Sequence, residues 1–383
     1  MATREALDWS QACKHFLDVR VKLQVVLLSL SSSNLRLGPV CNCAYDVLGL
    51  PTSEKALISK IKIAAGPRAL DRHSYRKPPL PKIGMVVTGI GDDCAVLRLP
   101  PNRDLLATTD FSLENVHFRR AWHPAQSVGH RCLARGLSDI AAMGGDPLAA
   151  FLSLALPAKL PQSWLDRFTR GLLKLAHESG ISLAGGDTAQ SRSGVLADII
   201  VLGSVPKGTA VLRSGARPGD RIYVTGTLGA AAAALDLLVA KHKLTPRKFP
   251  KHFFPQPRIH QGRVLRAKKL ASSMIDISDG LSTDLSHICE ESRVGAELWE
   301  NSLPRATIGK PANPVSLRFA LHGGDEYELL FTAAPDRPVP SIIFGVPITC
   351  IGQITRFRKI FLVDSRGRKS LVLPGGWEHF RPQ

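Results

Sequence analysis

From Met85 onward, short apolar runs alternate with longer stretches in which apolar residues recur at helical spacing. Short apolar runs bounded by turn residues predict strands, and the helical repeat predicts amphipathic helices. Strands are predicted at 94–99, 105–109, 149–156, 181–184, 198–205, 221–225, 274–277, 327–332 and 348–354. Helices are predicted at 124–143, at 161–178, from the turn at 226–229 to about 240, and at 280–292. This alternation places the chain in the mixed α/β class.

The length of 383 residues is sufficient for two domains. A stretch rich in Gly and Pro at 206–220 predicts the boundary between them. We expect an N-terminal domain at 53–206 and a C-terminal domain at 217–380, with residues 1–52 as an extension of unassigned role. The first domain should open with a helix at 53–64, because Ser53 begins a capping-box pattern followed by apolar residues at helical spacing.

Five short acidic motifs are spread along the two domains: Gly91–Asp93, Thr108–Asp110, Leu137–Asp139, Gly185–Asp187 and Asp276–Asp279. Several follow a predicted strand directly, where ligands of open α/β sheets bind. A single Asp in such a place is more often a helix cap or an Asx-turn, and Ser278 is a candidate cap as well. Five such motifs in a chain of net charge +18 favour a shared Mg²⁺ site that bridges phosphates.

The composition excludes several other classes of protein. The basic residues are densest at 241–269, but no zinc-finger or RRM pattern accompanies them, so a solvated basic face is favoured and no nucleic-acid partner is expected. No apolar stretch approaches the ~20 residues that span a bilayer, so no membrane partner is expected. Seven cysteines without a CxxC pair favour a reduced, cytoplasmic location.

Familiar kinase motifs are also missing. The chain has neither the Gly-x-x-x-x-Gly-Lys-Ser/Thr pattern of P-loop enzymes nor the HRD and DFG motifs of protein kinases. Arg213 and Arg258 are candidate phosphate clamps, although each could equally be an ordinary surface arginine. His117 lies seven residues after Asp110, and either a substrate contact or a structural role fits it equally well.

Nine segments follow one another in an order that carries a family resemblance: GIGDDCAVL, TTDFSLENVHF, LSDIAAMGGDP, GGDT, RSGARPGD, VTGTLG, MIDISDGL, ALHGGDEYEL and GWEHF. Together they resemble the thiamine-monophosphate kinase family, whose superfamily includes aminoimidazole ribonucleotide synthetase. The resemblance covers roughly residues 84–380. It implies a two-domain fold like that of the synthetase, in which an N-terminal α/β domain dimerises and a C-terminal α/β domain closes the site. A homodimer is therefore expected.

The resemblance also implies an activity, the final step of thiamine diphosphate synthesis, in which ATP phosphorylates thiamine monophosphate with the help of several Mg²⁺ ions. The implied metal ligands are Asp93, Thr108, Thr109, Asp110, Asp139, Asp187, Asp276 and Asp279. The implied nucleotide contacts are Gly186, Asp187, Arg213 and Ser278, and the implied substrate contacts are His117, Asp325 and Trp377. No catalytic residue beyond the metal cluster is expected, because the second pKa of the attacking phosphate is ~6 and no strong base is needed.

Two positions depart from the family pattern. The family usually reads Gly-Gly-Glu-Asp-Tyr-Glu-Leu where this chain has Gly-Gly-Asp-Glu-Tyr-Glu-Leu, so Asp325 is one methylene shorter than the expected Glu. Its reach toward the thiamine is in doubt for that reason. Arg135 stands where small residues or Asn are usual, and it places an extra charge near Asp139. The metal set is intact, so activity is expected.

Two alternatives were weighed. The first is a sister activity of the superfamily. Selenophosphate synthetase would need a reactive Cys in a glycine-rich loop ahead of Gly91, and the hydrogenase-maturation relative would end in Cys, whereas this sequence ends Arg381-Pro382-Gln383. The second is a catalytically silent protein that binds RNA with its basic surface. A silent protein has no physical need for so many mutually repelling carboxylates, which argues against it.

Overall fold

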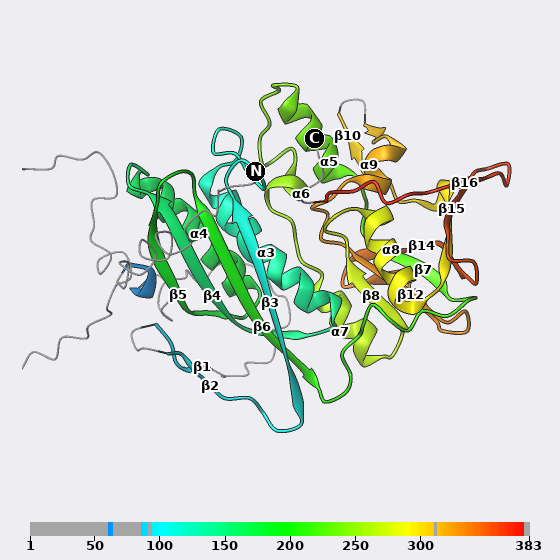
Figure 1. Cartoon of the computed structure of the whole chain (residues 1–383), viewed down its shortest axis with the longest axis horizontal. Helices are drawn as coiled ribbons and strands as arrows, with labels where there is room; N and C mark the ends of the chain where they lie inside the picture. Colours follow the sequence, from blue (N-terminus) through cyan, green and yellow to red (C-terminus); the bar gives the residue numbers. More distant parts are fainter. Residues whose placement is uncertain (1–59, 64–85, 91–93, 310–311, 379–383) are drawn as a thin grey trace, which may run out of the picture. The chain divides into compact units, whose positions relative to one another are not determined.

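The structure is a computed structural model that describes residues 60–63, 86–90, 94–309 and 312–378 (Figure 1). Contacts divide the chain into Met1–Asp46 and Val47–Gln383, and all that follows concerns the second unit. Of the helix predicted at 53–64, residues 60–63 are helical and the rest lies outside the described residues, as does the extension at 1–52. Within the described residues, no helix is both long and apolar enough to cross a membrane.

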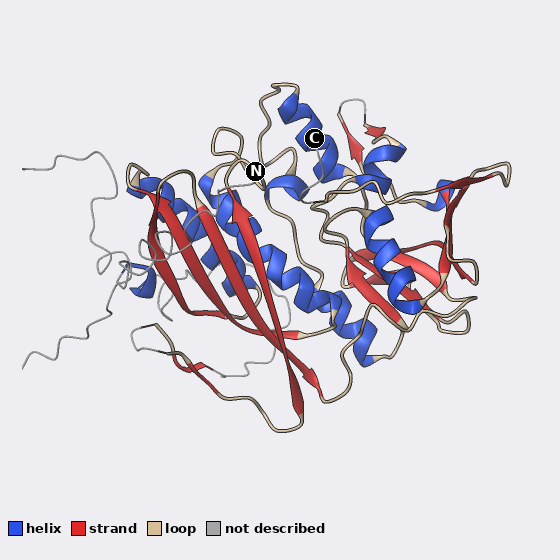
Figure 2. Ribbon diagram, in the orientation of Figure 1, coloured by secondary structure: helices blue, strands red, loops and turns tan. Residues whose placement is uncertain are grey.

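The first half of the chain forms a four-stranded sheet with the strand order β3-β6-β4-β5. The strands are β3 (Arg103–Leu113), β4 (Asp146–Pro157), β5 (Ser182–Ser191) and β6 (Leu196–Pro206). Helices α3 (Ala125–Ala142) and α4 (Gln162–Glu178) lie on one face of this sheet (Figure 2). A short hairpin of β1 (Val86–Thr88) and β2 (Val96–Leu97) precedes it. Strands and helices alternate as the apolar pattern predicts.

Helix α3 is the most deeply packed element of the N-terminal domain, and glycines explain how closely its neighbours approach. A Cβ at Gly129 would lie 2.0 Å from the Phe168 carbonyl oxygen, and one at Gly171 would lie 2.0 Å from that of Gln126. Helix α7 (Ile259–Ala267) contacts α3 in the same way, because a Cβ at Gly262 would lie 2.1 Å from the Ala141 oxygen. Only glycine allows backbones to pack at these distances.

The second half forms a larger mixed sheet with the order β16-β15-β9-β14-β7-β12-β8, and β13 pairs with β14. Its strands are β7 (Arg221–Thr225), β8 (Ser273–Asp276), β9 (Gly295–Trp299), β12 (Leu329–Ala333), β13 (Ile342–Ile343), β14 (Val346–Thr355), β15 (Ile360–Val363) and β16 (Lys369–Leu371). Sequence patterning missed β9, β13, β15 and β16. Helix α8 (Leu281–Ser292) packs against β8, β12 and β9. Its buried residues form a second hydrophobic core with the sheet.

Three shorter helices each contribute side chains to the wall of the cavity described below. They are α5 (Ala230–Val239), α6 (Pro250–Phe253) and α9 (Leu317–His322). Helix α5 contacts both α6 and α9, and α6 contacts α3 of the N-terminal domain. A small hairpin, β10 (Thr307–Ile308) with β11 (Asn313–Pro314), lies outside the main sheet. These elements position the site described next.

Candidate active site

A cavity of about 710 Å³ is lined by both halves of the chain. Strand β3 and helix α3 supply its acidic and basic groups from the N-terminal half. The turn after β8, helix α5, the segment 322–327 and the segment 375–377 supply the C-terminal half. The cavity therefore has walls from two separately formed sheets, which is the arrangement expected of a ligand site between domains.

Three carboxylates from three elements meet at one end of the cavity: Asp110 of β3, Asp139 of α3 and Asp276 at the end of β8. The Thr108 hydroxyl donates to Asp139, and the Ser138 Oγ donates to Asp276 Oδ2 at 2.6 Å. Burial and the neighbouring Asp139 raise the pKa of both Asp110 and Asp276 to about 7. Burial also raises the pKa of Asp139. Carboxylates crowded in this way are all ionised only when a cation compensates for their repulsion, and otherwise they hold protons.

Two arginines contribute positive charge to this cluster. Arg213 lies close enough to lower the pKa of Asp139 and of Asp276, opposing the larger effect of burial. Arg135 has the same influence on Asp110 and Asp139. Arg213 itself is exposed on the segment between the two halves of the chain, so its side chain is available to an anion at the acidic end.

The turn between β8 and α8 is organised by a residue that sequence reasoning missed. The Asp284 Oδ2 accepts the backbone N–H groups of Asp279 and Gly280, at 3.2 and 3.0 Å. Ser278 does not cap the helix, contrary to what its position had indicated, because the N-cap residue of α8 is Gly280 and no side chain of the described residues caps the helix. Asp279, Asp284 and His287 each offer a ligand atom within 4.8 Å of the others. The turn thus adds a second group of donors, and Ser278 and Asp279 line the cavity.

Two aspartates lie inside strands and not at strand ends, contrary to the prediction. Strand β3 continues past Asp110 to Leu113, and β5 continues past Asp187 to Ser191. Asp110 reaches the cavity because it alternates with Thr109 on β3: the Thr109 hydroxyl points to the opposite face and donates to Asp198 at 2.7 Å. The side chain of Thr109 is therefore not brought to the cluster.

Asp187 is also separated from the cluster. It lies on the edge strand β5, three strand positions from β3 in the sheet order, which corresponds to about 14 Å at the usual strand spacing. Its carboxylate is exposed and accepts the N–H of Thr188 at 2.8 Å. The neighbouring Gly186 has φ 152°, and a Cβ there would lie 1.8 Å from the Leu152 oxygen. Asp93 lies outside the described residues.

The three residues expected to contact the substrate all line the cavity: His117, Asp325 and Trp377. The His117 Nδ1 accepts the N–H of Leu113 at 3.0 Å, which places the proton of the neutral ring on Nε2. The Trp377 backbone N–H donates to the Asp279 oxygen at 3.0 Å, and 47% of the residue is exposed. Apolar or aromatic side chains of Val116, Trp122, Leu235 and Val239 also line the cavity.

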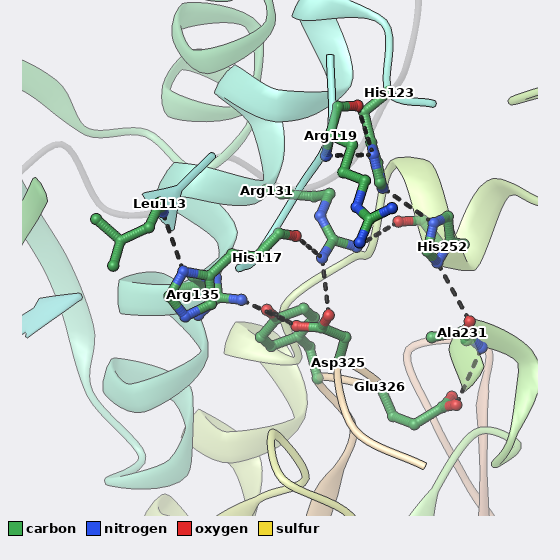
Figure 3. A network of polar contacts seen from close by, with 11 residues as sticks. Leu113, His117, Arg119, His123, Arg131, Arg135, Ala231, His252, Asp325 and Glu326 are labelled. Carbon is green, nitrogen blue, oxygen red and sulfur yellow. Dashed lines mark hydrogen bonds and ion pairs between the residues drawn. The ribbon is translucent and has the colours of Figure 1, made fainter. Parts of the chain in front are cut away.

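Asp325 is held by the protein on three sides (Figure 3). It accepts from Arg131 Nη2 at 2.8 Å, from Arg135 Nη2 at 3.2 Å and from the Tyr327 hydroxyl at 2.6 Å. Burial alone would raise its pKa, but the two arginines hold the pKa of Asp325 well below its usual range. The two departures from the family pattern, Asp325 and Arg135, are thus partners in one ion pair.

The next two acidic residues of the same segment have different environments. Glu326 Oε1 accepts the N–H groups of Gly229 and Ala231 at the start of α5, and burial raises the pKa of Glu326 to about 8. Glu328 is fully buried, but it pairs with Arg258 at 2.6 Å and with Lys251 at 2.9 Å. Arg258, a candidate phosphate clamp from sequence, is therefore committed to a buried carboxylate.

Two buried histidines connect the halves of the chain beside this network. The Nε2 atoms of His123 and His252 are 3.1 Å apart, and the His252 Nδ1–H donates to the Ala231 oxygen at 3.2 Å. This direction requires His123 Nε2–H to donate to His252 Nε2, which must then be unprotonated, so the His252 ring is neutral. The His123 Nδ1 lies 3.2 Å from the backbone N of Arg119 and 3.1 Å from its carbonyl oxygen. Burial lowers the pKa of His123 to about 4 and that of His252 to about 3.

Sequence reasoning missed Arg131, Asp284, Glu328 and both histidines as parts of the site. The clearest available pattern was on α3, where Arg131, Arg135 and Asp139 recur at intervals of four within an otherwise apolar helix. Such spacing places charges on one helix face, and a buried face that carries charges usually meets charged partners or a ligand.

Comparisons with known families agree with this architecture. The family described as AIR synthase related protein, N-terminal domain, matches residues 91–205, and the corresponding C-terminal domain matches residues 217–343. The fold and the cavity between its halves therefore define a two-domain protein of the AIR synthase related class.

Individual relatives narrow the class. The thiamine-monophosphate kinase of Escherichia coli (strain K12) is 42% identical over 306 residues, which cover 77% of this chain and 92% of the relative. The crystal structure of thiamine-monophosphate kinase from Stenotrophomonas maltophilia K279a is 32% identical, with a TM-score of 0.68 over 83% of this chain and 98% of that one. AaThiL complexed with AMPPCP and TMP is 29% identical, with a TM-score of 0.65 over 87% and 97%. The chain belongs to the thiamine-monophosphate kinase family.

The histidine pair makes stability depend on pH. Both imidazoles have folded-state pKa values below the ordinary 6.5, so between pH 6.5 and 4 the unfolded chain binds more protons than the folded one. The contribution of these two histidines to stability is therefore complete above pH 6.5 and falls as the pH is lowered, by up to about 1.4 kcal/mol per pH unit for each histidine. The neighbouring Arg131 favours the neutral rings further, whereas Asp325 opposes this. Denaturant unfolding at several pH values, compared with His252→Phe, measures the effect, and equal slopes in both proteins would contradict it.

Proposed function

We propose that this chain transfers the γ-phosphoryl group of ATP to thiamine monophosphate and so forms thiamine diphosphate. The observation that carries the proposal is a single cavity lined by two unlike groups of residues. One is the carboxylate cluster of Asp110, Asp139 and Asp276, and the other comprises His117, Trp377 and apolar side chains. Phosphates with their metal ions suit the first group, and a cationic aromatic ring suits the second.

The donor set fits Mg²⁺. Asp110, Asp139 and Asp276 present carboxylate oxygens from three elements, and the Thr108 hydroxyl lies beside them, which are the oxygen donors that this ion prefers. These residues would hold one ion or more, with Asp279 adding a donor from the next turn. When bound, Mg²⁺ would offset the negative charge on the phosphate oxygens. The described structure does not bring the Thr109 side chain or Asp187 to the same cluster, so we assign neither to that ion.

The protein's own part in the reaction is to position two anions. An oxygen of the acceptor phosphate attacks the γ-phosphorus in line, the bond from the γ-phosphorus to its bridging oxygen breaks, and ADP leaves with that electron pair. The acceptor oxygen is already ionised near neutral pH, because the second phosphate pKa is ~6. No side chain needs to remove a proton, so positioning supplies much of the acceleration.

The nucleotide and thiamine contacts follow from placement. Arg213 is exposed and close enough to Asp139 and Asp276 to reach a nucleotide phosphate, and Ser278 lines the cavity beside them. For Gly186 and Asp187 we retain a nucleotide contact on the strength of the family resemblance alone. On the other wall, the half-exposed Trp377 offers an aromatic face to the cationic thiazolium ring, and His117 offers a polar contact.

We further propose a homodimer formed through the N-terminal domains. The face of the four-stranded sheet opposite α3 exposes large apolar side chains: Leu105 is 48% exposed, Phe111 55% and Ile200 37%. They share that face because Leu105 and Phe111 alternate with the inward Asp110, while Ile200 pairs with Thr109. Exposed apolar patches of this kind mark protein interfaces.

Two further expectations concern location and boundaries. The four described cysteines, Cys94, Cys132, Cys289 and Cys350, carry free thiols, which supports a reducing compartment such as the cytoplasm. We place the domains at 53–206 and 217–380, because the two family matches end at 205 and begin at 217.

The proposed activity predicts release of ADP that depends on thiamine monophosphate. The purified chain with ATP and Mg²⁺ should release ADP when thiamine monophosphate is added, and chelation of the metal should stop it. Free thiamine and an aminoimidazole ribonucleotide serve as alternative substrates in the same coupled assay. No release with thiamine monophosphate, or faster release with the aminoimidazole compound, would refute the proposal.

Asp110→Asn should separate activity from stability. Loss of one carboxylate from the cluster should lower turnover by roughly 10²–10³, since the metal and the phosphates lose a charged partner. Without metal, the variant should be at least as stable as the parent, because repulsion from Asp139 is removed. Asp166→Asn on the exposed face of α4 is the matched control. Near-normal turnover in Asp110→Asn, or loss of its fold, would show that the cluster is misassigned.

Phe111→Glu should convert the dimer into a monomer. A charge on the exposed sheet face makes burial of that face unfavourable, so light scattering after size exclusion should report half the parent mass. Phe357→Glu, at a residue that is 79% exposed on the other domain, should leave the mass unchanged. A dimer that persists in Phe111→Glu, or a monomeric parent, would contradict the proposed interface.

A further inference from the structure

Helix α3 presents three charged side chains in sequence toward the cavity: Arg131, Arg135 and Asp139. Each is four residues from the next, so they follow one face of the helix, and 15 of the helix's 18 residues, Arg131 among them, are buried. Charges on such a helix are costly unless each has a partner. Arg131 and Asp139 have clear partners, which leaves the question of what Arg135 does.

The Arg131 guanidinium makes three hydrogen bonds to other parts of the protein. Its Nη1 donates to the His252 oxygen at 2.6 Å, and its Nη2 donates to Asp325 at 2.8 Å and to the His117 oxygen at 3.5 Å. Only 4% of its side chain is exposed. In Figure 3 it lies at the centre of the network, directed toward three separate segments. These contacts give Arg131 a structural role in joining the two halves of the chain.

Arg135 differs from Arg131 in this respect. Its contact with Asp325 is a long one, at 3.2 Å through Nη2, and among the described residues no other hydrogen bond from its guanidinium is recorded. A guanidinium has five N–H donors, so most of the N–H donors of Arg135 remain available for hydrogen bonds to a ligand. Its side chain is 15% exposed and lines the cavity. A positive, donor-rich group at a cavity wall is suited to a ligand anion.

The surroundings of Arg135 indicate which anion it would meet. On one side it approaches the carboxylates Asp110 and Asp139, and on the other it contacts Asp325. An anion bound here would therefore lie between the metal cluster and the predicted thiamine contacts, which is where the acceptor phosphate must be if it is to attack the nucleotide.

We propose that Arg135 binds the phosphate of the acceptor and that it thereby makes the site selective for thiamine monophosphate over free thiamine. This inference rests on the proposed function and names one residue that enforces it. Asp325 positions the guanidinium by its single contact, and the remaining N–H groups clamp the phosphate oxygens in bidentate fashion. The competing explanation is that Arg135 only helps Arg131 to hold Asp325.

The test compares Arg135→Gln and Arg135→Lys with the parent in steady-state kinetics. For Arg135→Gln, the KM for thiamine monophosphate should rise about tenfold or more, as expected for loss of a charge-assisted hydrogen bond, while the KM for ATP stays within about threefold. The inhibition constant of free thiamine, which has no phosphate, should stay unchanged. Arg135→Lys keeps the charge but loses the fork, so its KM should be intermediate. Arg170→Gln, on the exposed face of α4, is the matched control.

A double-mutant cycle separates binding from positioning. If Arg135 binds phosphate, Arg135→Gln should still raise the KM for thiamine monophosphate when Asp325 is already Asn. If the effect vanishes in that background, Arg135 acts only through Asp325 and the proposal is overturned. An equal rise in both KM values, or in the inhibition constant of free thiamine, overturns it as well. Should Arg135→Gln fail to fold, an unchanged KM in Arg135→Lys decides against the proposal and an intermediate one supports it.

Failure of the proposed function would be recognised separately. In that case the parent protein shows no ADP release with thiamine monophosphate, and the inference is tested by calorimetric titration with thiamine monophosphate and with inorganic phosphate. Binding of either that weakens about tenfold in Arg135→Gln but not in Arg170→Gln supports an anion site at Arg135. Equal binding by both variants overturns it.

Discussion

The buried charged face of α3 is the constraint on which the rest of the structure depends. Ions in a protein interior are tolerated only when partners compensate for the lost hydration. Here the partners come from the C-terminal half of the chain: Asp325 accepts from Arg131, and Asp276 accepts from Ser138, the residue next to Asp139. Because Asp325 and Asp276 both belong to the C-terminal half, these contacts of α3 also fix how that half meets the N-terminal half. The cavity is the space left at that junction.

The segment 325–328 shows how three adjacent acidic residues acquire different properties from their surroundings. Asp325 stays ionised between two arginines, Glu326 is inclined to hold its proton at the start of α5, and Glu328 is ionised against Arg258 and Lys251. Each side chain thus connects this segment to a different element. The local sequence Asp-Glu-Tyr-Glu contains three carboxylic acids of similar intrinsic pKa, and only the fold distinguishes them.

Much of the fold could be read from the sequence, because apolar periodicity reports burial directly. The helix predicted at 124–143 is observed as α3 at Ala125–Ala142, and the strands around it were found with shifted ends. The positions of Asp110 and Asp187 were misjudged, because polar residues inside β3 and β5 broke the apolar runs and made the strands appear to end early. Strands β15 and β16 were missed because each is short, with four and three residues, and the edge strand β16 is exposed along its length.

The site was predictable only in part. The motifs identified the aspartates that meet at the cavity, and the prediction that Asp110, Asp139 and Asp276 share a site agrees with their placement. Sequence could not reveal that Arg131 and Arg135 pair with Asp325, because the partners are 194 and 190 residues apart. The same is true of Glu328 and Arg258, which are 70 residues apart. Long-range ion pairs leave no periodic pattern, so the doubt about the reach of Asp325 could be resolved only by the fold, which gives it protein partners.

The three glycines that pack against α3 bear on how such a protein can change over time. At Gly129, Gly171 and Gly262, any added carbon would meet a backbone carbonyl oxygen that cannot move aside. Substitution of these glycines during evolution is therefore excluded by packing, whatever ligand the cavity binds. Variation that alters ligand preference must therefore accumulate among the side chains of the cavity wall. Arg135 and Asp325 occupy such positions. Both depart from the family pattern and they form an ion pair, so they are a paired change of the kind that the fixed packing of α3 permits.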